Sequence, residues 1–100
     1  MRERDIEEYL RQRVMAMGGE TRKVKWIGRD GAPDRLVMMP ASVWGVGSAT
    51  WAELKRPGKL ATFPADAHER AQHREHERMR ALGQHVVVID SLAGVDELLK

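Results

Sequence analysis

Three charged residues, Asp34, Glu53 and Lys55, stand in stretches whose composition is otherwise typical of β-strands. Side chains alternate across a strand, so Glu53 and Lys55 project from the same face, about 7 Å apart along the chain. If Asp34 lies beside Glu53 on a neighbouring strand, the two carboxylates can share one divalent cation close to the ammonium group of Lys55. Magnesium suits such a site, because it accepts few protein carboxylates and completes its octahedral shell with water and substrate phosphate.

The chemistry that this set could perform is phosphodiester hydrolysis. A bound Mg²⁺ would lower the pKa of a coordinated water and neutralise charge on the phosphorus, while Lys55 could orient the water or stabilise the same charge. A structural interpretation is also open. In it, Asp34 caps the turn after Pro33, and Glu53 and Lys55 form the solvated face of an edge strand.

The hydrophobic pattern predicts the elements that hold these residues, beginning with a helix over residues 3–17 that ends at Gly18-Gly19. Its apolar positions recur at helical spacing: Ile6, Leu10, Val14 and Met17. Three strands are predicted over residues 23–27, 34–39 and 50–55. Residues 40–49 connect the last two strands and could extend them into a hairpin with Trp44 near its tip.

The second half of the chain predicts a charged helix over residues 65–82, closed by Gly83. An apolar run over residues 85–89 is typical of a strand buried on both faces. A final short helix carries Val95, Leu98 and Leu99. The order is helix, three strands, helix, strand, helix, which predicts an α/β fold.

Length and composition limit the class of protein. One hundred residues predict a single domain over residues 1–100, and 42% apolar and 32% charged residues are typical of a soluble globular chain. The absence of cysteine excludes disulfides, thiolate zinc sites and cysteine nucleophiles, and it favours a reducing cytoplasm. Residues 2–8 alternate basic and acidic side chains, so we expect no signal peptide. Pro40, Gly45 and Gly47 interrupt the longest uncharged stretch, residues 36–52, so we also expect no association with a membrane. The net charge of +2 permits nucleic-acid binding without requiring it.

Two motifs carry a resemblance to a known family. Gly31-Ala-Pro-Asp-Arg-Leu-Val37, followed by Trp51-Ala-Glu-Leu-Lys-Arg-Pro-Gly58, resembles the VRR-NUC domain, a branch of the PD-(D/E)xK nuclease superfamily. The similarity extends to Ile6-Glu-Glu-Tyr-Leu10, Gly18-Gly19 and residues 72–83. It implies a restriction-endonuclease-like core with a mixed central sheet flanked by helices, in the same element order as the hydrophobic pattern predicts.

The resemblance also implies roles for individual residues. It makes Asp34 and Glu53 metal ligands, Lys55 a catalytic lysine and Gln72 a further catalytic residue. Gln72 lies seven residues before Met79, which predicts that it points toward the sheet. The segment before Gln72 is longer than the family pattern, so a surface position on the helix is the alternative. The resemblance adds an acid on the first helix, for which it favours Glu7 with Glu3 in reserve. Helical geometry leaves both open, because only Glu8 points away from the apolar stripe.

Basic residues surround the proposed site and could bind DNA phosphates without reading sequence. They are Lys23, Lys25, Arg29, Arg35, Arg56 and Lys59. His73 and His76 share a helical face and could be considered as zinc ligands. The alternating Arg and Glu residues around them favour a solvated face instead.

The function that the resemblance implies is a Mg²⁺-dependent DNA endonuclease, with Mn²⁺ as a substitute, in a bacterial or phage-infected cell. Stand-alone relatives, often from phages, are associated with branched DNA, and fused relatives belong to DNA repair nucleases. So small a chain suggests a homodimer similar to Holliday junction resolvases. Two alternatives remain: a DNA-binding or assembly module without catalysis, and an RNA nuclease. The intact set of Asp34, Glu53 and Lys55 speaks against the first, because carboxylates repel phosphate. A lack of stacking aromatics speaks against the second.

Overall fold

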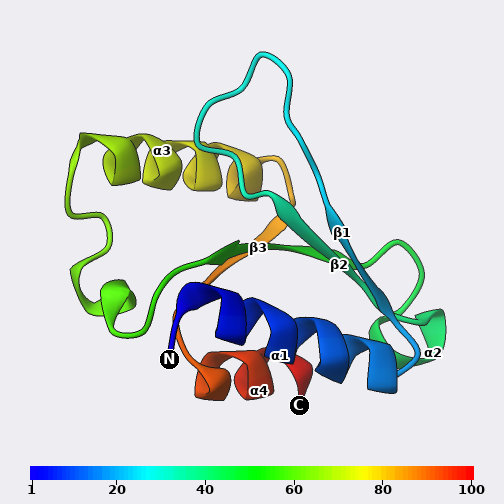
Figure 1. The fold of residues 1–100 in the computed structure, drawn as a ribbon. Helices are drawn as coiled ribbons and strands as arrows, with labels where there is room; N and C mark the ends of the chain where they lie inside the picture. The colour runs from blue at the N-terminus through cyan, green and yellow to red at the C-terminus, as the bar shows by residue number, and fades with distance from the viewer.

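A four-stranded mixed β-sheet forms the middle layer of the molecule, with one long helix on one face and two helices on the other (Figure 1). The computed structural model describes residues 1–100. In chain order the elements are α1 (Glu3–Ala16), β1 (Glu20–Lys23), β2 (Arg35–Met38), α2 (Ala41–Trp44), β3 (Ala49–Leu54), a 3-10 helix (Lys59–Thr62), α3 (Ala67–Ala81), β4 (His85–Ile89) and α4 (Leu92–Leu99). The expected α/β order is confirmed, with two short helical turns added. No helix has the length and apolar character needed to cross a membrane.

The strand order in the sheet is β1-β2-β3-β4. The first three strands are antiparallel, and β4 runs parallel to β3 after the crossover through α3. Along β3, Ala52 and Leu54 are buried in the core on the side of α1 and α4, so Trp51 and Glu53 point to the face that carries α3.

The apolar core lies between the sheet and the layer of α1 and α4. Ile6, Leu10 and Val14 are fully buried there, as the helical spacing predicts, and they pack with Val37 and Val95. Complete burial of an aliphatic side chain contributes about 1.5–3 kcal/mol, so this stripe fixes α1 against the sheet.

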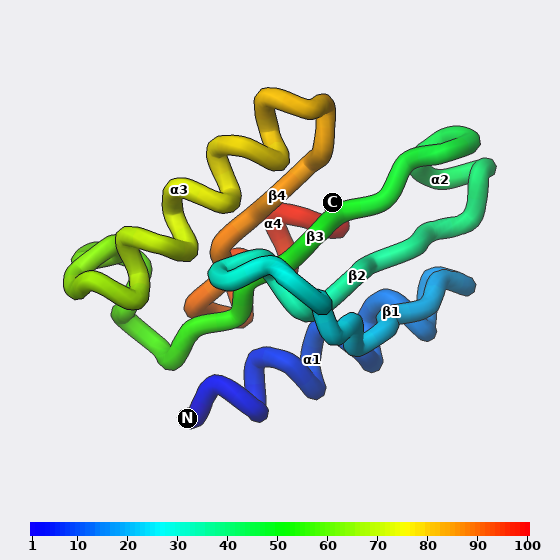
Figure 2. Tube along the Cα trace, turned by 90° about the horizontal axis from the view of Figure 1, so that it is seen from above, coloured from blue at the N-terminus to red at the C-terminus, as the bar shows by residue number.

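The interface between α3 and the sheet is mainly polar. The buried side chains of α3 are Glu69, Gln72, Glu75, His76 and Met79. Figure 2 shows α3 running beside β4, with the loop between β1 and β2 reaching toward it. Buried polar groups need hydrogen-bond partners. The polar side chains of a functional site are therefore expected at this interface.

The predicted strand over residues 23–27 is wrong, because β1 ends at Lys23. The β1–β2 register pairs Lys23 with Arg35, and the N–H of Val24 still donates to the carbonyl of Asp34 at 2.8 Å. The next pair in this register would set Lys25 against Pro33, which has no N–H to donate. The chain therefore leaves the sheet, and Ile27 is 94% exposed.

Two further expectations differ from the structure. The hairpin extension is replaced by α2, and Trp44 packs half-buried against the core rather than standing at an exposed tip. The strand over residues 85–89 forms as predicted, but it lies at an edge of the sheet and is not buried on both faces. Its apolar sequence reflects the contact with β3 and the flanking helices, which an edge strand can also make.

Candidate active site

The ends of β2 and β3 bring Asp34 and Glu53 together. In the β2–β3 register Arg35 lies opposite Ala52, and one further step sets Asp34 opposite Glu53. Directly opposed residues of antiparallel strands have Cα atoms about 5 Å apart. The side chain of Asp34 is half exposed, whereas that of Glu53 is 12% exposed. The two predicted metal ligands are therefore neighbours at one end of the sheet.

Lys55 follows β3 directly and is held by residues of α3. Its backbone N–H donates to the carbonyl of Ile89 at 2.8 Å, which keeps this residue aligned with β4. Its ammonium group donates to Oε1 of Gln72 at 2.6 Å and lies 3.2 Å from Oε2 of Glu69. It also lies 5.2 Å from the centre of the Phe63 ring. These contacts fix a long, flexible side chain in one place.

Gln72 points toward the sheet as expected, and its partner is the ammonium group of Lys55. The loop between β1 and β2 packs closely against the backbone of α3 at this residue. Gly31 has φ +83°, and a Cβ added there would lie 2.8 Å from the carbonyl oxygen of Ala71 and 3.0 Å from Cα of Gln72. Only glycine lets the backbone of the Gly31-Ala-Pro-Asp motif pass so near α3.

Glu69 is a buried contact of Lys55 that the sequence did not reveal. Its carboxylate accepts from the N–H of Ala65 at 2.9 Å and pairs with Lys55 and Lys59 at 3.2 Å each. Burial alone would raise the pKa of Glu69, but these partners lower it to about 2. The available signal was its position three residues before Gln72, on the same face of the helix.

His76 also differs from its prediction. The expected solvated face holds for His73, but His76 has no exposed surface, and its Nε2 lies 3.3 Å from Oε1 of Glu53. Gln72 and His76 are one helical turn apart, and Glu53 and Lys55 share a strand face. One face of α3 therefore contacts both members of the predicted Glu-x-Lys pair.

The acids of α1 fall into three different surroundings. Glu8 is exposed and binds Arg11 and Gln12, as its position on the helix predicts. Glu7 forms an ion pair with the buried Arg35, and its Oε2 lies 3.9 Å from Nζ of Lys23. Glu7 is thus largely neutralised by basic partners.

The charges of Lys55, Glu53 and Asp34 act on the carboxyl group of Glu3. Partial burial raises the pKa of its carboxyl, and the ammonium group of Lys55 opposes this rise. The charges of three other carboxylates raise the pKa further: Glu53, Glu7 and Asp34. The charge of Glu3 therefore interacts with those of Asp34, Glu53 and Lys55.

The donor set fits a hard divalent cation in its chemistry. No three Asp, Glu or His side chains are arranged close enough to enclose a metal ion. The groups that meet at the end of β2 and β3 are nevertheless carboxylates, the ligands that Mg²⁺ and Mn²⁺ prefer. Partial burial is the main cause of the raised pKa of Glu3, and repulsion from Glu53, Glu7 and Asp34 adds to it; a cation bound between these carboxylates would offset that repulsion.

A groove with a volume of about 390 Å³ opens beside Asp34. Its lining includes three of the predicted phosphate-binding residues, Lys23, Lys25 and Arg29, together with Trp26 and Asp34. Nζ of Lys23 lies 3.7 Å from Oδ2 of Asp34, so the basic lining of the groove extends to one of the proposed metal ligands.

The other predicted phosphate-binding residues have different positions. Arg56 is exposed, whereas Lys59 pairs with Glu69. Arg35 is buried and paired with Glu7, which corrects its predicted place on the DNA-binding surface. Arg35 lies on the face of β2 that meets α1, because it alternates with Leu36 and shares the side of Val37.

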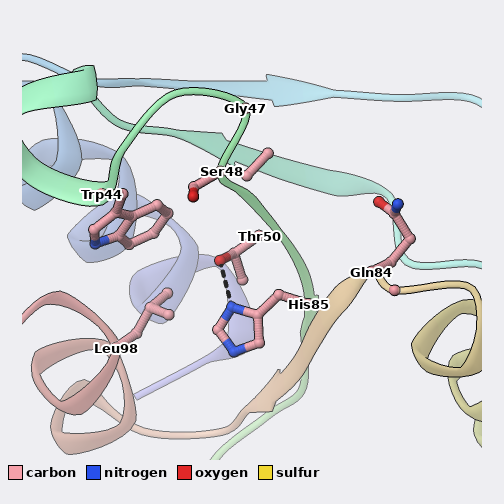
Figure 3. Close-up of a pocket in the computed structure, with 9 residues that line it drawn as sticks. Trp44, Gly47, Ser48, Thr50, Gln84, His85 and Leu98 are labelled. Carbon is pink, nitrogen blue, oxygen red and sulfur yellow. Dashed lines mark hydrogen bonds between the residues drawn. The ribbon is translucent and has the colours of Figure 1, made fainter.

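A second cavity, of about 410 Å³, lies at the opposite end of β3 (Figure 3). In it Trp44 and Leu98 face Thr50 and His85, whose Oγ1 and Nδ1 atoms are 2.8 Å apart. Its lining contains no carboxylate. The chemistry of a cation site is therefore found only at the Glu53 end of the strand.

Comparisons with known proteins give two close likenesses. A protein of Acyrthosiphon pisum secondary endosymbiont phage 1 named "Putative nuclease p44" is 40% identical over 91 residues, which cover 91% of this chain and 85% of the phage protein. A solved structure described as a VRR_NUC domain has a TM-score of 0.72 and 34% identity, over 96% of this chain and 91% of that one. No protein-family model matches the chain.

Proposed function

This chain belongs to the VRR-NUC nuclease family, and from that premise we propose that it is an endonuclease that hydrolyses phosphodiester bonds of DNA with a divalent cation. The observation that carries this proposal is the meeting of Asp34, Glu53 and Lys55 at one end of the sheet. The name of the phage relative and the description of the solved domain support the coarser part of this proposal, nuclease activity.

Asp34 and Glu53 would hold the cation, with Glu3 as the acid of α1 that joins them. Glu3 is preferred over Glu7 because Glu3 is coupled to both carboxylates, whereas Glu7 is occupied by Arg35. The preferred cation is Mg²⁺, with Mn²⁺ as a substitute. Once bound, it would supply Lewis-acid stabilisation of the phosphate charge and activation of water.

The chain's own residues orient the DNA and stabilise charge. Lys23, Lys25 and Arg29 line the groove beside Asp34, where they would bind backbone phosphates next to the scissile one. Lys55 would place its fixed ammonium group against the negative charge that grows on the phosphate oxygens. Gln72 and Glu69 keep that group in position, so little reorganisation is needed during the reaction.

The proposed substrate is branched DNA, cut by a homodimer. Each chain carries a single cluster of this kind, and symmetric cutting of two strands at a junction requires two clusters. Homodimerisation would supply the second cluster and a longer surface for the DNA.

Incubation with labelled four-way junction, flap, linear duplex and single-stranded RNA, with Mg²⁺ or EDTA, tests the reaction and its substrate. We expect Mg²⁺-dependent cleavage, fastest on the junction. Absence of cleavage on every substrate would contradict a catalytic role, and cleavage of RNA alone would contradict the DNA assignment. Light scattering tests the dimer: a monomer of 11.4 kDa at micromolar concentration, with a rate first order in protein, would contradict it.

A further inference from the structure

His76 is a buried polar residue whose contacts all lie within the protein. It has no exposed surface, so it cannot touch DNA. Its Nε2 lies 3.3 Å from Oε1 of Glu53, and the Phe63 ring stacks on its ring with centroids 5.9 Å apart and an interplanar angle of 22°. The direct polar link between His76 and the site is its contact with Glu53.

The surroundings of the ring determine where its proton lies. Nδ1 is buried and has no hydrogen-bond partner. A proton on Nδ1 would create a buried donor without an acceptor, at a cost of about 1–3 kcal/mol. The proton is therefore on Nε2, and Nε2–H donates to Oε1 of Glu53.

We propose that His76 is a positioning residue that orients the Glu53 carboxylate toward the divalent cation. The inference rests on the proposed function, because it assigns Glu53 as a ligand. A hydrogen bond to Oε1 fixes the rotation of the carboxylate and leaves Oε2 available for the cation. Such outer contacts orient metal ligands in many sites, and their loss costs about 10–100-fold in metal affinity or activity.

The arrangement of α3 supports this role. Gln72 and His76 lie one helical turn apart on α3, and Lys55 and Glu53 lie two residues apart in the chain. Gln72 contacts Lys55, and His76 contacts Glu53. The helix α3 therefore fixes the position of the Glu53 carboxylate relative to the Lys55 ammonium group.

Mn²⁺ binding to the full chain without DNA tests the proposal by titration calorimetry. His76→Leu should weaken Mn²⁺ binding about 10-fold or more, since it removes the donor. His76→Gln should restore binding close to wild type, because its amide can donate from a position near that of Nε2. His73→Leu is the matched control: His73 is exposed on the same helix and also contacts Phe63, with centroids 6.2 Å apart, so it should bind as wild type.

Two further measurements separate positioning from folding. Added to Glu53→Gln, His76→Leu should not weaken Mn²⁺ binding further, because both changes act through the same carboxylate. In wild-type protein, nitrogen NMR should show the His76 ring protonated at Nε2, which gives a result even if His76→Leu does not fold.

The outcomes distinguish the two proposals. If wild type and His76→Leu bind Mn²⁺ equally well, or if the only proton of the His76 ring is on Nδ1, the role of His76 is overturned and the nuclease proposal stays intact. A wild type that neither binds Mn²⁺ nor cleaves DNA overturns the proposed function and this inference with it.

Discussion

Lys55 donates a hydrogen bond from Nζ to Oε1 of Gln72, across 2.6 Å and between two elements that are distant in the sequence. The ammonium group is largely removed from solvent, so it needs such partners to replace lost hydration. Gln72 supplies one neutral oxygen and Glu69 supplies a charged one. The position of the proposed catalytic lysine is therefore determined by α3 rather than by its own strand alone.

Glu69 should make stability depend on pH in the acid range. Its pKa is lowered from the ordinary value of 4.5 to about 2, so its ionised form stabilises the fold above the ordinary value. That contribution is lost as the pH falls from 4.5 toward 2. Urea denaturation should therefore show the unfolding free energy of wild type falling more steeply over this range than that of Glu69→Gln. Glu97→Gln, at an exposed site, should follow wild type, and parallel curves for all three proteins would contradict the pairing of Glu69.

Glu3 and Glu7 should respond differently to neutralisation. Glu3→Gln removes a carboxylate whose ionised form is disfavoured by partial burial and by neighbouring carboxylates. It should therefore weaken Mn²⁺ binding while raising the stability of the metal-free protein by about 0.5 kcal/mol. Glu7→Gln leaves the buried Arg35 without its ion-pair partner. It should cost about 1–2 kcal/mol, less than a fully buried pair because Glu7 is partly exposed, with little change in Mn²⁺ affinity. Titration calorimetry measures the Mn²⁺ affinity of both variants, and thermal unfolding measures their stability. The reverse pattern would make Glu7 the ligand.

The groove beside Asp34 should bind DNA through phosphate charges. Lys25→Ala should reduce the slope of log K against log salt by about 0.9, the value expected for one phosphate contact. Fluorescence anisotropy in EDTA measures this slope without cleavage. Lys100→Ala, which removes an exposed lysine paired with Glu97 on α4, should leave the slope unchanged. An equal loss of slope in both variants would show that the groove has no special part in binding.

Gly31 should be intolerant of a side chain for a reason that Gly28 does not share. Both have positive φ, +83° and +77°, so alanine strains either backbone by about 1–3 kcal/mol. Only at Gly31 does the added Cβ also meet backbone atoms of α3. Thermal unfolding should show Gly31→Ala to be clearly less stable than Gly28→Ala. Equal stability would mean that the loop does not pack on α3 as described.

Much of this fold follows from local pattern. The stripe of Ile6, Leu10 and Val14 predicts α1 and its buried face, because helix periodicity is a property of the segment itself. The limits of β1 could not be predicted in this way. They depend on which residue of β2 lies opposite, and the pairing stops where Lys25 would meet Pro33.

The site residues also divide into those predicted from local sequence and those that depend on tertiary packing. Asp34, Glu53 and Lys55 are found from their unusual place in strands and from the motif resemblance. The choice of Glu3 over Glu7 depends on the buried charge of Arg35, and the burial of His76 depends on the polar face of α3 meeting β3. Charge alternation along α3 indicates a solvated helix, and only the packed structure shows which of those polar residues turn inward.

We propose that Asp34, Glu53 and Lys55, at the end of β2 and β3, cleave DNA, and the rate of cleavage of a labelled four-way junction by Lys55→Ala tests this most directly. With Mg²⁺, the wild type and the control Lys100→Ala should cleave at equal rates, and EDTA should stop both. Lys55→Ala should be slower by about 100-fold or more, with junction binding in EDTA unchanged. Cleavage by Lys55→Ala at the wild-type rate, or cleavage by wild type that persists in EDTA, would contradict the account.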